Sequence, residues 1–421
     1  MKILVIGSGA REHAICWRMS RSPKVTEVLC APGNPGTEAC ARNLPIAVTA
    51  VSDLVAAARE HGVDLTVVGP EAALEAGVAD AFMAAGLPIV GPVKAAANLE
   101  SSKAFAKEVM VESGVPTATY QTFTTRHELE AYCEKKGAPL VLKSDGLASG
   151  KGVFVITDKA QFAPAIDALF GSLKSELVVA EEFLSGVEVS CIFASNGVDV
   201  VALAPAHDYK RLGDGDSGPN TGGMGSICPT PRISAQELAW IEEHCAAPII
   251  RTMSARGTPF RGFLYAGVMV PLEPAQRPEG IKVLEYNTRL GDPECQAIVS
   301  RLESDPVELM GWIAGMVKER PGLSWSKSVS ACVVIASDGY PEAPVKGDEI
   351  VGLELAKLVP GTMIFHAGTA RGERGKVVAT GGRTLSVVAR GESVEEARLG
   401  AYKAVDMLQL RGRRVRRDIG A

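Results

Sequence analysis

The chain has 421 residues, 46% of them hydrophobic and 22% charged, so about three folded domains are expected and a disordered or fibrous protein is excluded. Its 44 Lys and Arg against 49 Asp and Glu give a formal net charge of -5, which argues against nucleic acid as a partner. Aromatic residues make up only 5%, which favours an α/β protein over an aromatic-rich β-sandwich.

The nine cysteines are odd in number and form no Cys-x-x-Cys pair, so neither a disulfide framework nor a metal pair is indicated. Such usage is typical of the reducing cytoplasm. The apolar start ends at Gly7, too early for the core of a signal peptide, and no later apolar run reaches the ~18 residues of a membrane span. We therefore expect a cytoplasmic protein without a membrane segment.

Over residues 1–100, apolar runs alternate with helical stretches, which predicts a doubly wound domain on a parallel sheet. The expected strands are 3–6, 25–30, 65–68 and 88–90. The expected helices are 52–60, with Ser52 as N-cap, and 71–85, ended by Gly86.

Three glycine loops follow strands of this domain. The first, Gly7-Ser-Gly-Ala-Arg-Glu-His13, opens a helix, where free backbone N–H groups favour a phosphate. Glu12 stands where a dinucleotide fingerprint has its third glycine, and no acid ends the second strand, so NAD is disfavoured. Gly33-Asn-Pro-Gly36 and Gly69-Pro-Glu71 would meet the first loop at the carboxyl edge of the sheet. We predict a phosphate contact, with ordinary strand-to-helix turns as the alternative.

The less regular segment up to about residue 325 predicts a mixed domain over 101–325, with a small mobile lobe near 115–190. The expected helices are 101–113, 126–136, 158–170 and 234–256, the last with a capping box of Ser234 and Glu237. The expected strands are 117–123, 139–143, 153–156, 177–181, 263–271 and 281–287.

The loop Lys143-Ser-Asp-Gly-Leu-Ala-Ser-Gly-Lys-Gly152 is not a P-loop, because Asp145 replaces its first glycine and Gly152 the Ser or Thr that holds magnesium. Between two strands, such a loop can still close over phosphates as a lid, using its N–H groups and Lys151 while Lys143 reaches up from the strand. A mobile hairpin with a solvated lysine is the alternative.

The strand at 177–184 ends in two acids and two large apolar residues, which suits adenine through backbone hydrogen bonds and apolar walls. Glu188 follows and can accept a hydrogen bond from a ribose hydroxyl. A solvated acid at a strand end is the alternative.

In Ile281-Lys-Val-Leu-Glu-Tyr-Asn-Thr-Arg289, strand alternation places Glu285, Asn287 and, if the strand persists, Arg289 on one face. Magnesium takes oxygen ligands together with substrate phosphates, and arginine grips phosphate or carboxylate, so this row suits a metal–nucleotide complex. The alternative is the polar outer face of an edge strand.

The segment Gly213–Gly225 holds six glycines in thirteen residues. With Asp208 and Lys210 just upstream, it indicates a substrate loop rather than disorder. The C-terminal domain, 326–421, predicts strands at 329–336, 362–366, 376–380 and 383–390, a hairpin turn at Gly381-Gly382, and a helix over 393–410 capped by Ser393 and Glu396.

Taken in order, these segments resemble the phosphoribosylamine–glycine ligase family of the ATP-grasp superfamily. The resemblance rests on the motifs that end at His13, Gly36, Glu71, Gly152, Gly225 and Glu294, and it covers nearly the whole chain. It implies an ATP-grasp body between a parallel-sheet domain and a C-terminal mixed domain. It also implies ligation of glycine to 5-phosphoribosylamine through glycyl phosphate, with ATP and Mg²⁺ or Mn²⁺.

The resemblance implies the following site residues. For ATP these are Lys103, Lys143, Ser149, Gly150, Lys151, Gly152, Glu181, Glu182, Phe183, Leu184 and Glu188. For the metal they are Glu285 and Asn287. For glycine and phosphoribosylamine they are Gly9, Arg11, Glu12, Gly33, Asn34, Gly36, Pro70, Glu71, Asp208, Lys210, Asp216, Asn220, Arg289 and Asp292. The expected catalytic residues are Arg289, Lys143 and Asp292.

The nearest alternative is another ATP-grasp enzyme, such as a carboxylase that acts on a purine precursor and starts from bicarbonate. A regulator from a different class would bind a nucleotide without catalysis and contact nucleic acid through its C-terminal arginines. These are Arg411, Arg413, Arg414, Arg416 and Arg417. A solvated helix end or an internal acidic contact is favoured, because the net charge is negative. We expect a monomer or a weak homodimer.

Overall fold

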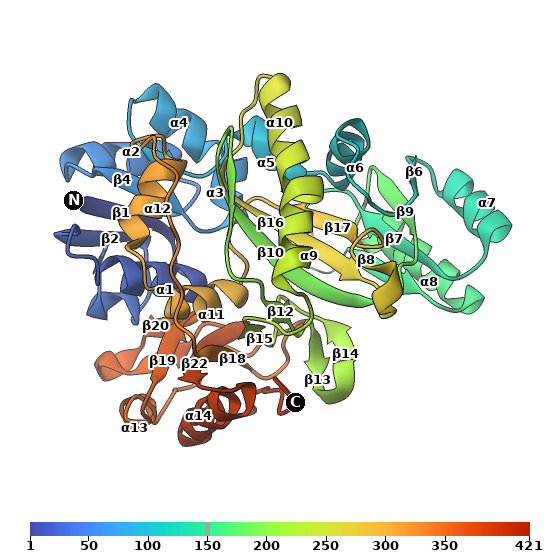
Figure 1. Cartoon of the computed structure of the whole chain (residues 1–421). Coiled ribbons are helices and arrows are strands. Elements are labelled where there is room, and N and C mark those ends of the chain that lie inside the picture. The colour runs from blue at the N-terminus through green and yellow to red at the C-terminus, as the bar shows by residue number, and fades with distance from the viewer. Residues whose placement is uncertain (148–151) are drawn as a thin grey trace.

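The computed structural model describes residues 1–147 and 152–421 and confirms the expected α/β class. Figure 1 shows three parts, each with its own sheet, around the central strands β10 (Val187–Asn196), β16 (Arg261–Val270) and β17 (Lys282–Asn287). The predictions for Ser149, Gly150 and Lys151 concern residues outside the described ranges.

The N-terminal sheet is parallel throughout, with strand order β3-β2-β1-β4-β5. Its strands are β1 (Lys2–Gly7), β2 (Glu27–Pro32), β3 (Arg42–Asn43), β4 (Leu65–Val68) and β5 (Ile89–Val90). Its helices are α1 (Ala10–Met19), α2 (Val51–Glu60), α3 (Glu71–Glu75), α4 (Val78–Ala84) and α5 (Lys94–Ser101). Both faces of β1 are buried: Ile3 and Val5 enter one core cluster and Leu4 and Ile6 another, so the strand reads as an unbroken apolar run.

Two predictions in this part were wrong in detail. The expected helix 71–85 is broken into α3 and α4, because Gly77 has a φ of +83° in the left-handed region, where a helix cannot continue. The N-cap of α2 is Ala50 rather than Ser52, and it makes no side-chain capping hydrogen bond.

The central sheet is antiparallel, with strand order β11-β10-β16-β17, and β11 spans Val200–Ala202. It is covered by α6 (Lys103–Glu112), α9 (Ala235–Ile241) and α10 (Ala247–Ala255). The expected helix 101–113 begins only after Ser102, whose hydroxyl accepts a hydrogen bond from Phe105 N and caps α6. The capping box of Ser234 and Glu237 is confirmed, although a π-helical turn separates α9 from α10.

A smaller sheet, with strand order β6-β9-β7-β8, forms a lobe at the right of Figure 1. Its elements are β6 (Tyr120–Phe123), α7 (Arg126–Lys136), β7 (Leu140–Ser144), β8 (Val153–Ile156), α8 (Phe162–Asp167) and β9 (Val178–Glu182). It has its own core, in which Leu142 and Leu169 are fully buried. The mobility of this lobe stays a prediction.

The C-terminal sheet has the order β12-β15-β18-β22-β19 and takes two strands from the middle of the chain. Its strands are β12 (His207–Asp208), β15 (Gly225–Cys228), β18 (Val329–Ala336), β19 (Thr362–His366) and β22 (Arg383–Gly391). The helices nearby are α11 (Glu294–Arg301), α12 (Pro306–Ile313), α13 (Leu353–Ala356) and α14 (Val394–Met407). The segment between β12 and β15 is a ribbon of β13 (Arg211–Gly213) and β14 (Ser217–Asn220), not a wholly open loop.

The predicted hairpin at Gly381-Gly382 is wrong. The strand before it, β21 (Val377–Ala379), pairs with β20 (Thr369–Arg371), whereas β22 pairs with β18 and β19. Both glycines have a positive φ, so the chain turns there from the small ribbon into the larger sheet.

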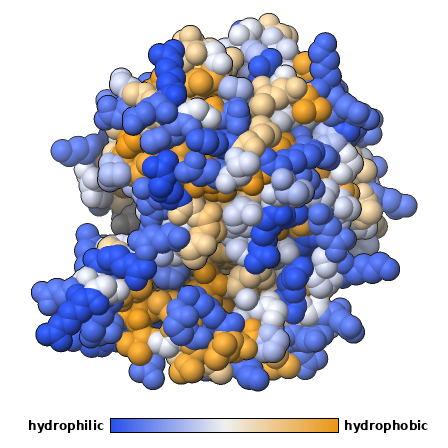
Figure 2. Space-filling model, turned by 90° about the vertical axis from the view of Figure 1, so that its left-hand side faces the viewer, coloured by the Kyte–Doolittle hydropathy of each residue, from blue (hydrophilic) through white to orange (hydrophobic). Residues whose placement is uncertain are grey.

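Charged and apolar side chains are unevenly distributed over the surface. Figure 2 shows mainly hydrophilic side chains, with apolar ones gathered low on this face, at the height of the C-terminal part in Figure 1. Exposed apolar side chains of that part include Val351, Leu355, Leu358 and Leu399. Within the ranges 1–147 and 152–421, every helix is too short or too polar to span a membrane.

Candidate active site

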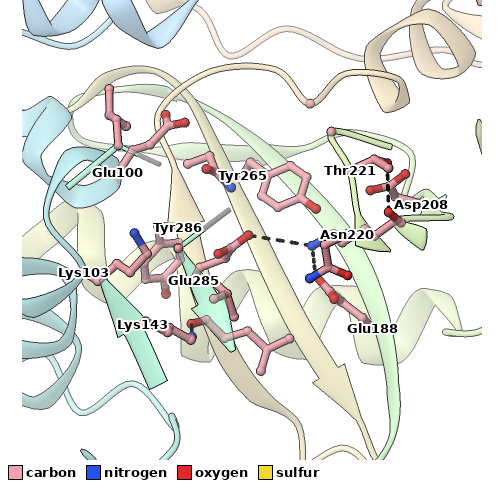
Figure 3. A pocket seen from close by; sticks show the side chains of 18 of the residues that line it. Glu100, Lys103, Lys143, Glu188, Asp208, Asn220, Thr221, Tyr265, Glu285 and Tyr286 are labelled. Atoms are coloured by element: carbon pink, nitrogen blue, oxygen red, sulfur yellow. Dashed lines mark hydrogen bonds and ion pairs between the residues drawn. The ribbon is translucent and has the colours of Figure 1, made fainter. Parts of the chain in front are cut away.

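A cavity of about 770 Å³ lies between the parallel-sheet part, the central sheet, the lobe and the C-terminal sheet. This volume is in the range of small-molecule sites. Figure 3 shows Lys103, Lys143 and Glu285 on one side of the cavity and Glu188, Asn220 and Asp208 on the other. Residues far apart in the sequence therefore meet in one site.

A buried network of charges forms one end of the cavity. Lys143, on β7, lies with its Nζ 2.9 Å from Glu181 Oε1 and donates a hydrogen bond of 3.2 Å to Leu284 O. Lys107 Nζ lies 2.9 Å from Glu181 Oε2. Lys103, one turn earlier on α6, donates to Gly146 O at 2.9 Å. The sequence reasoning missed Lys107, although its i+4 spacing from Lys103 puts both lysines on one helix face.

This end of the cavity also has apolar walls. Gly152, Phe183 and Leu184 line it, as expected, together with the apolar side chains Val141, Val153, Val155, Met269 and Leu284. Glu182 sits at the rim, where Lys282 Nζ lies 2.6 Å from its Oε1. The end thus combines apolar surface with lysines, which suits a flat base attached to phosphates.

Glu285 and Asn287, on β17, both line the cavity. Burial by itself would raise the pKa of Glu285, but Lys210, Lys143 and other cations outweigh it, and the net pKa is lowered. Lys210 Nζ lies 3.8 Å from Glu285 Oε1 and pairs with Glu188. Glu285 is therefore a carboxylate surrounded by cations, with the amide of Asn287 two residues away on the same strand.

Arg289 lies just beyond the end of β17 and lines the same cavity. Its Nη2 lies 2.8 Å from Glu100 Oε1, and its Nε lies 3.4 Å from Glu71 Oε2. Glu100 also accepts hydrogen bonds from the backbone N and the hydroxyl of Thr288, at 2.7 and 3.0 Å. Glu100, which the sequence reasoning missed, fixes the turn that aims Arg289 into the cavity.

A second group of acids lies opposite. The Oδ1 atom of Asp208 is buried and has no hydrogen-bond partner among the described residues. Burial, with Glu294 nearby, raises the pKa of Asp208 well above its ordinary value. Glu294, at the start of α11, is 2% exposed and accepts a hydrogen bond of 2.8 Å from Ser190 Oγ. Ser190 Oγ also lies 2.8 Å from Tyr265 OH. The sequence reasoning missed Glu294 as a site residue.

The C-terminal part closes this side of the cavity, which the sequence reasoning did not foresee. Arg383 donates hydrogen bonds of 2.6 Å to both Gly222 O and Asp292 O, and its Nη2 lies 3.3 Å from Asp292 Oδ2. Tyr340 OH accepts a hydrogen bond of 3.1 Å from Gly222 N. No motif marks Arg383, since only the fold brings it to Asp292.

The first glycine loop packs behind the cavity. Gly9 N donates to Glu12 Oε2, and Arg11 Nε donates to Glu12 Oε1, both at 2.6 Å. Arg11 also donates to Leu290 O at 3.0 Å and, with Glu71, lines the cavity. Glu12 is buried in this loop and holds its turn.

Other expected residues lie away from the cavity lining. Asn34 Nδ2 donates hydrogen bonds of 2.8 Å to Ser8 O and to His366 O, so its loop packs against β19. Gly33, Gly36 and Pro70 lie beside these loops and outside the lining. Asp216 is not brought to the cavity either, because its exposed carboxylate pairs with Arg416 at 2.8 Å on the far side of the ribbon.

The structure also shows the state of the cysteines and the partners of the tail arginines. All nine cysteines, which lie within the described ranges, are free thiols. Arg411, Arg414 and Arg417 pair with Asp348, Asp338 and Asp406 of the C-terminal part, at 2.7, 2.7 and 2.8 Å. The basic tail thus makes the internal acidic contacts that the sequence favoured.

Three family models match consecutive parts of this chain. They are described as phosphoribosylglycinamide synthetase, N domain, over residues 1–100; ATP-grasp (A) domain, over residues 101–295; and C domain, over residues 330–421. Together they span most of the sequence.

The chain is also similar to named proteins over its full length. The phosphoribosylamine–glycine ligase of Ralstonia nicotianae is 44% identical over 424 residues, which cover 100% of this chain and 99% of the relative. The crystal structure of the phosphoribosylamine–glycine ligase of Thermotoga maritima is 35% identical and matches with a TM-score of 0.85 over 100% of both chains. The biotin carboxylase domain of the Hydrogenobacter thermophilus 2-oxoglutarate carboxylase, solved with MgADP and bicarbonate, has a TM-score of 0.72 at 16% identity. That match covers 98% of this chain and 91% of the other, and it is a likeness of fold alone.

Proposed function

The chain belongs to the phosphoribosylglycinamide synthetase family, and from that premise we propose how its cavity performs the family's reaction. The protein is an ATP-dependent ligase that joins glycine to 5-phosphoribosylamine in purine biosynthesis. The observation that carries the proposal is that Lys103, Lys143 and Glu285 share one cavity with an apolar wall and a separate acidic side.

ATP is assigned to the end between β17 and the lobe. Adenine would lie against the apolar wall beside Phe183 and Leu184, and Lys103 and Lys143 would meet the phosphates. Glu182 and Gly152 belong to the rim of this subsite, and Glu188 is the proposed partner of the ribose. Because Glu188 is paired with Lys210 in this structure, a ribose hydroxyl would have to join or replace that contact.

The metal, Mg²⁺ or Mn²⁺, is assigned to Glu285 and Asn287. Among the described residues, no group of three or more His, Cys, Asp or Glu side chains is arranged to hold a metal by itself. The two oxygen donors of β17 fit an ion that takes its other ligands from phosphates and water. When bound, such an ion neutralises the charge that develops on the phosphates.

The acidic side of the cavity is assigned to the other substrates. Asp208 and Asp292 are the proposed partners of amines, while Lys210 and Asn220 are the proposed partners of carboxylate and hydroxyl groups. Arg11, with Gly9 and Glu12 shaping its loop, and Glu71 would face the phosphoribosyl group. The loop residues Gly33, Asn34, Gly36 and Pro70 would support it from behind, because they pack beside the cavity rather than in its wall.

The proposed reaction has two steps. The carboxylate of glycine attacks the γ-phosphorus of ATP, and the bond to ADP breaks, giving glycyl phosphate. The amine of phosphoribosylamine then attacks the acyl carbon, phosphate leaves, and the amine gives up a proton. Two anions must meet in the first step, so cations matter more than a base, and Arg289 and Lys143 are the proposed catalytic cations. Asp292 is proposed to orient the attacking amine.

We propose a separate role for each part of the chain. Residues 1–100 bind the phosphoribosyl group, 101–325 bind ATP and metal, with a lobe at 115–190 that closes over the nucleotide, and 326–421 complete the far wall. The free thiols support a cytoplasmic enzyme. We assign it as a monomer or weak homodimer without a nucleic-acid partner, in keeping with the net charge of -5.

Phosphate release from ATP tests the reaction, with glycine and freshly prepared phosphoribosylamine omitted in turn. Release is expected only when both are present. Release that does not depend on glycine would overturn the ligase assignment, and release that requires bicarbonate would instead point to a carboxylase of the same fold. A magnesium titration in the same assay, repeated with manganese, identifies the preferred metal.

A further inference from the structure

The end of the ribbon β13–β14 forms part of the cavity wall, at the proposed glycine and phosphoribosylamine sites. Asn220, Thr221 and Gly222, at its end, line the cavity. Within the part of the chain that the structure describes, the two strands pair only with each other and belong to no larger sheet. A two-stranded ribbon alone is marginal in water, so its position must come from contacts with the rest of the chain.

The C-terminal tail supplies the contacts at the outer end of the ribbon. The side chain of Arg416 is 1% exposed, and its Nη1 donates hydrogen bonds to Asp216 Oδ1 at 2.8 Å and to Arg211 O at 3.1 Å. Its Nε and Nη2 bind the two oxygens of Asp418 at 2.8 and 2.6 Å. The guanidinium also lies 5.0 Å from the centre of the Tyr209 ring. Among the described residues, the hydrogen bonds of this guanidinium are all with the ribbon or with the tail itself.

Other hydrogen bonds also join the tail to the ribbon and to Tyr209. Gly215 N donates a hydrogen bond of 2.9 Å to Asp418 Oδ2, and Arg417 N donates one of 2.7 Å to Asp214 Oδ1. Gly420 N donates to Tyr209 OH at 3.0 Å. The turn between the two strands of the ribbon is thus tied to the tail.

The inner end of the ribbon is held by a different part of the C-terminal segment. Arg383 and Tyr340 bind the carbonyl and the N–H of Gly222, as described above. The ribbon is therefore fixed at both ends by residues from beyond the central sheet. Displacing either end would move Asn220 and Thr221, which lie between them.

We propose that Arg416 is a positioning residue of the ligase: it anchors the ribbon β13–β14 and so sets the place of Asn220 and Thr221 in the cavity. This inference rests on the proposed function. It gives the otherwise unassigned basic tail a role in binding glycine or phosphoribosylamine rather than an external polyanion. Lys103 and Lys143, which we assign to the phosphates of ATP, lie on the opposite side of the cavity (Figure 3), so we expect this anchor to affect nucleotide binding less.

The test compares Arg416→Ala and Arg416→Lys with Arg411→Ala in steady-state assays of the full chain. Arg411 is the matched control, because it lies in the same tail but pairs with Asp348, away from the ribbon. Since Arg416→Ala removes several charge-assisted hydrogen bonds, the KM for glycine or for phosphoribosylamine should rise about tenfold or more. The KM for ATP should stay within about twofold, and Arg416→Lys, which keeps the charge, should be intermediate.

Asp216→Ala provides a second test of the same contact in case Arg416→Ala does not fold. The Asp216 side chain is 72% exposed, so its removal takes away one bond at the ribbon without opening the core. The same KM should rise about two- to threefold. Wild-type values in a folded Arg416→Ala, or in Asp216→Ala where Arg416→Ala is unfolded, would overturn the proposal, as would an equal rise in the KM for all three substrates. If the wild type itself lacks glycine-dependent turnover, the proposed function fails instead.

Discussion

Lys107 Nζ lies 2.9 Å from Glu181 Oε2, and each side chain is only 2% exposed. Glu181 also faces Lys143 at 2.9 Å, so two buried lysines share one buried carboxylate between α6 and the lobe. Burial lowers the pKa of Lys107 to about 8, and Glu181 works against that shift. The network couples the lobe to the helix that carries Lys103.

Replacing Lys107 by methionine is expected to destabilise the protein. Glu181 would keep only Lys143 as a partner, and breaking a buried ion pair costs about 3 kcal/mol in the free energy of unfolding. Denaturant titration measures this loss. Lys135→Met, at an exposed position on α7, should change the stability by less than about 0.5 kcal/mol. Equal effects of the two variants would contradict the structural role of Lys107.

Replacing Glu285 by alanine is expected to abolish turnover with the fold intact, because it removes a proposed metal ligand at the phosphates. The kcat should fall by about 100-fold or more, while thermal unfolding stays close to that of the wild type. Glu279→Gln, on the exposed loop before β17, is the control. Near-normal activity at saturating magnesium would remove Glu285 from the metal site.

Replacing Gly223 by alanine is expected to damage the acidic side of the cavity. Its φ is +108°, and a Cβ there would lie 2.7 Å from Asp208 Oδ1 and closer still to Pro293. The combined backbone strain and crowding should cost about 2 kcal/mol or more. Gly222→Ala is the comparison, because its φ is ordinary and its neighbour is the movable end of Arg383. Unfolding curves and the KM for glycine should separate the two variants, and a milder effect at Gly223 would refute this explanation.

Acid is expected to loosen the contact between the N-terminal and C-terminal parts through two buried histidines. His366 N donates a hydrogen bond of 2.9 Å to His13 Nδ1, which accepts only while that nitrogen carries no proton. Burial lowers the pKa of His13 to about 3 and that of His366 to about 4. A histidine with a lowered pKa contributes stability above pH 6.5, and this stability is lost as the pH falls, since only the unfolded chain takes up the proton.

Between pH 7 and pH 5 the loss should reach about 2 kcal/mol for each histidine. Denaturant titrations at pH 5, 6 and 7 measure it. His366→Gln removes one titrating ring and keeps the backbone N–H. Over this pH range, the free energy of unfolding of the variant should therefore fall by roughly half as much as that of the wild type. An unchanged pH dependence would show that this pair is not responsible.

The sequence was informative about several features that local rules decide. Strand alternation correctly predicted that Glu285 and Asn287 share a face, and both line the cavity. Capping chemistry correctly marked the start of α9 at Ser234. Such features depend on neighbours a few residues away, which periodicity and turn chemistry describe.

These local rules do not predict which strands pair when they are far apart in the sequence. Gly381-Gly382 has the local chemistry of a hairpin, but the strand partner of β22 is β18, some fifty residues earlier, and no turn signal encodes that choice. Arg383 and Glu294 had no local signal for their place in the site. The glycine-rich composition of the ribbon indicated a substrate loop. It did not predict that Asp216 pairs with Arg416 while Asn220 lines the cavity.

The pairing of β15 with β18 has a consequence for the order in which the protein is made. Strand β15 at residues 225–228 can pair with β12 early, but it acquires its other neighbour, β18, only when residues 329–336 have left the ribosome. The anchor at Arg416 follows later still. Chains fold largely from the N-terminus as they emerge, so the nucleotide end can assemble first. The ribbon and the part of the cavity wall that it forms therefore reach their final place only after the segment that holds Arg416 has been made.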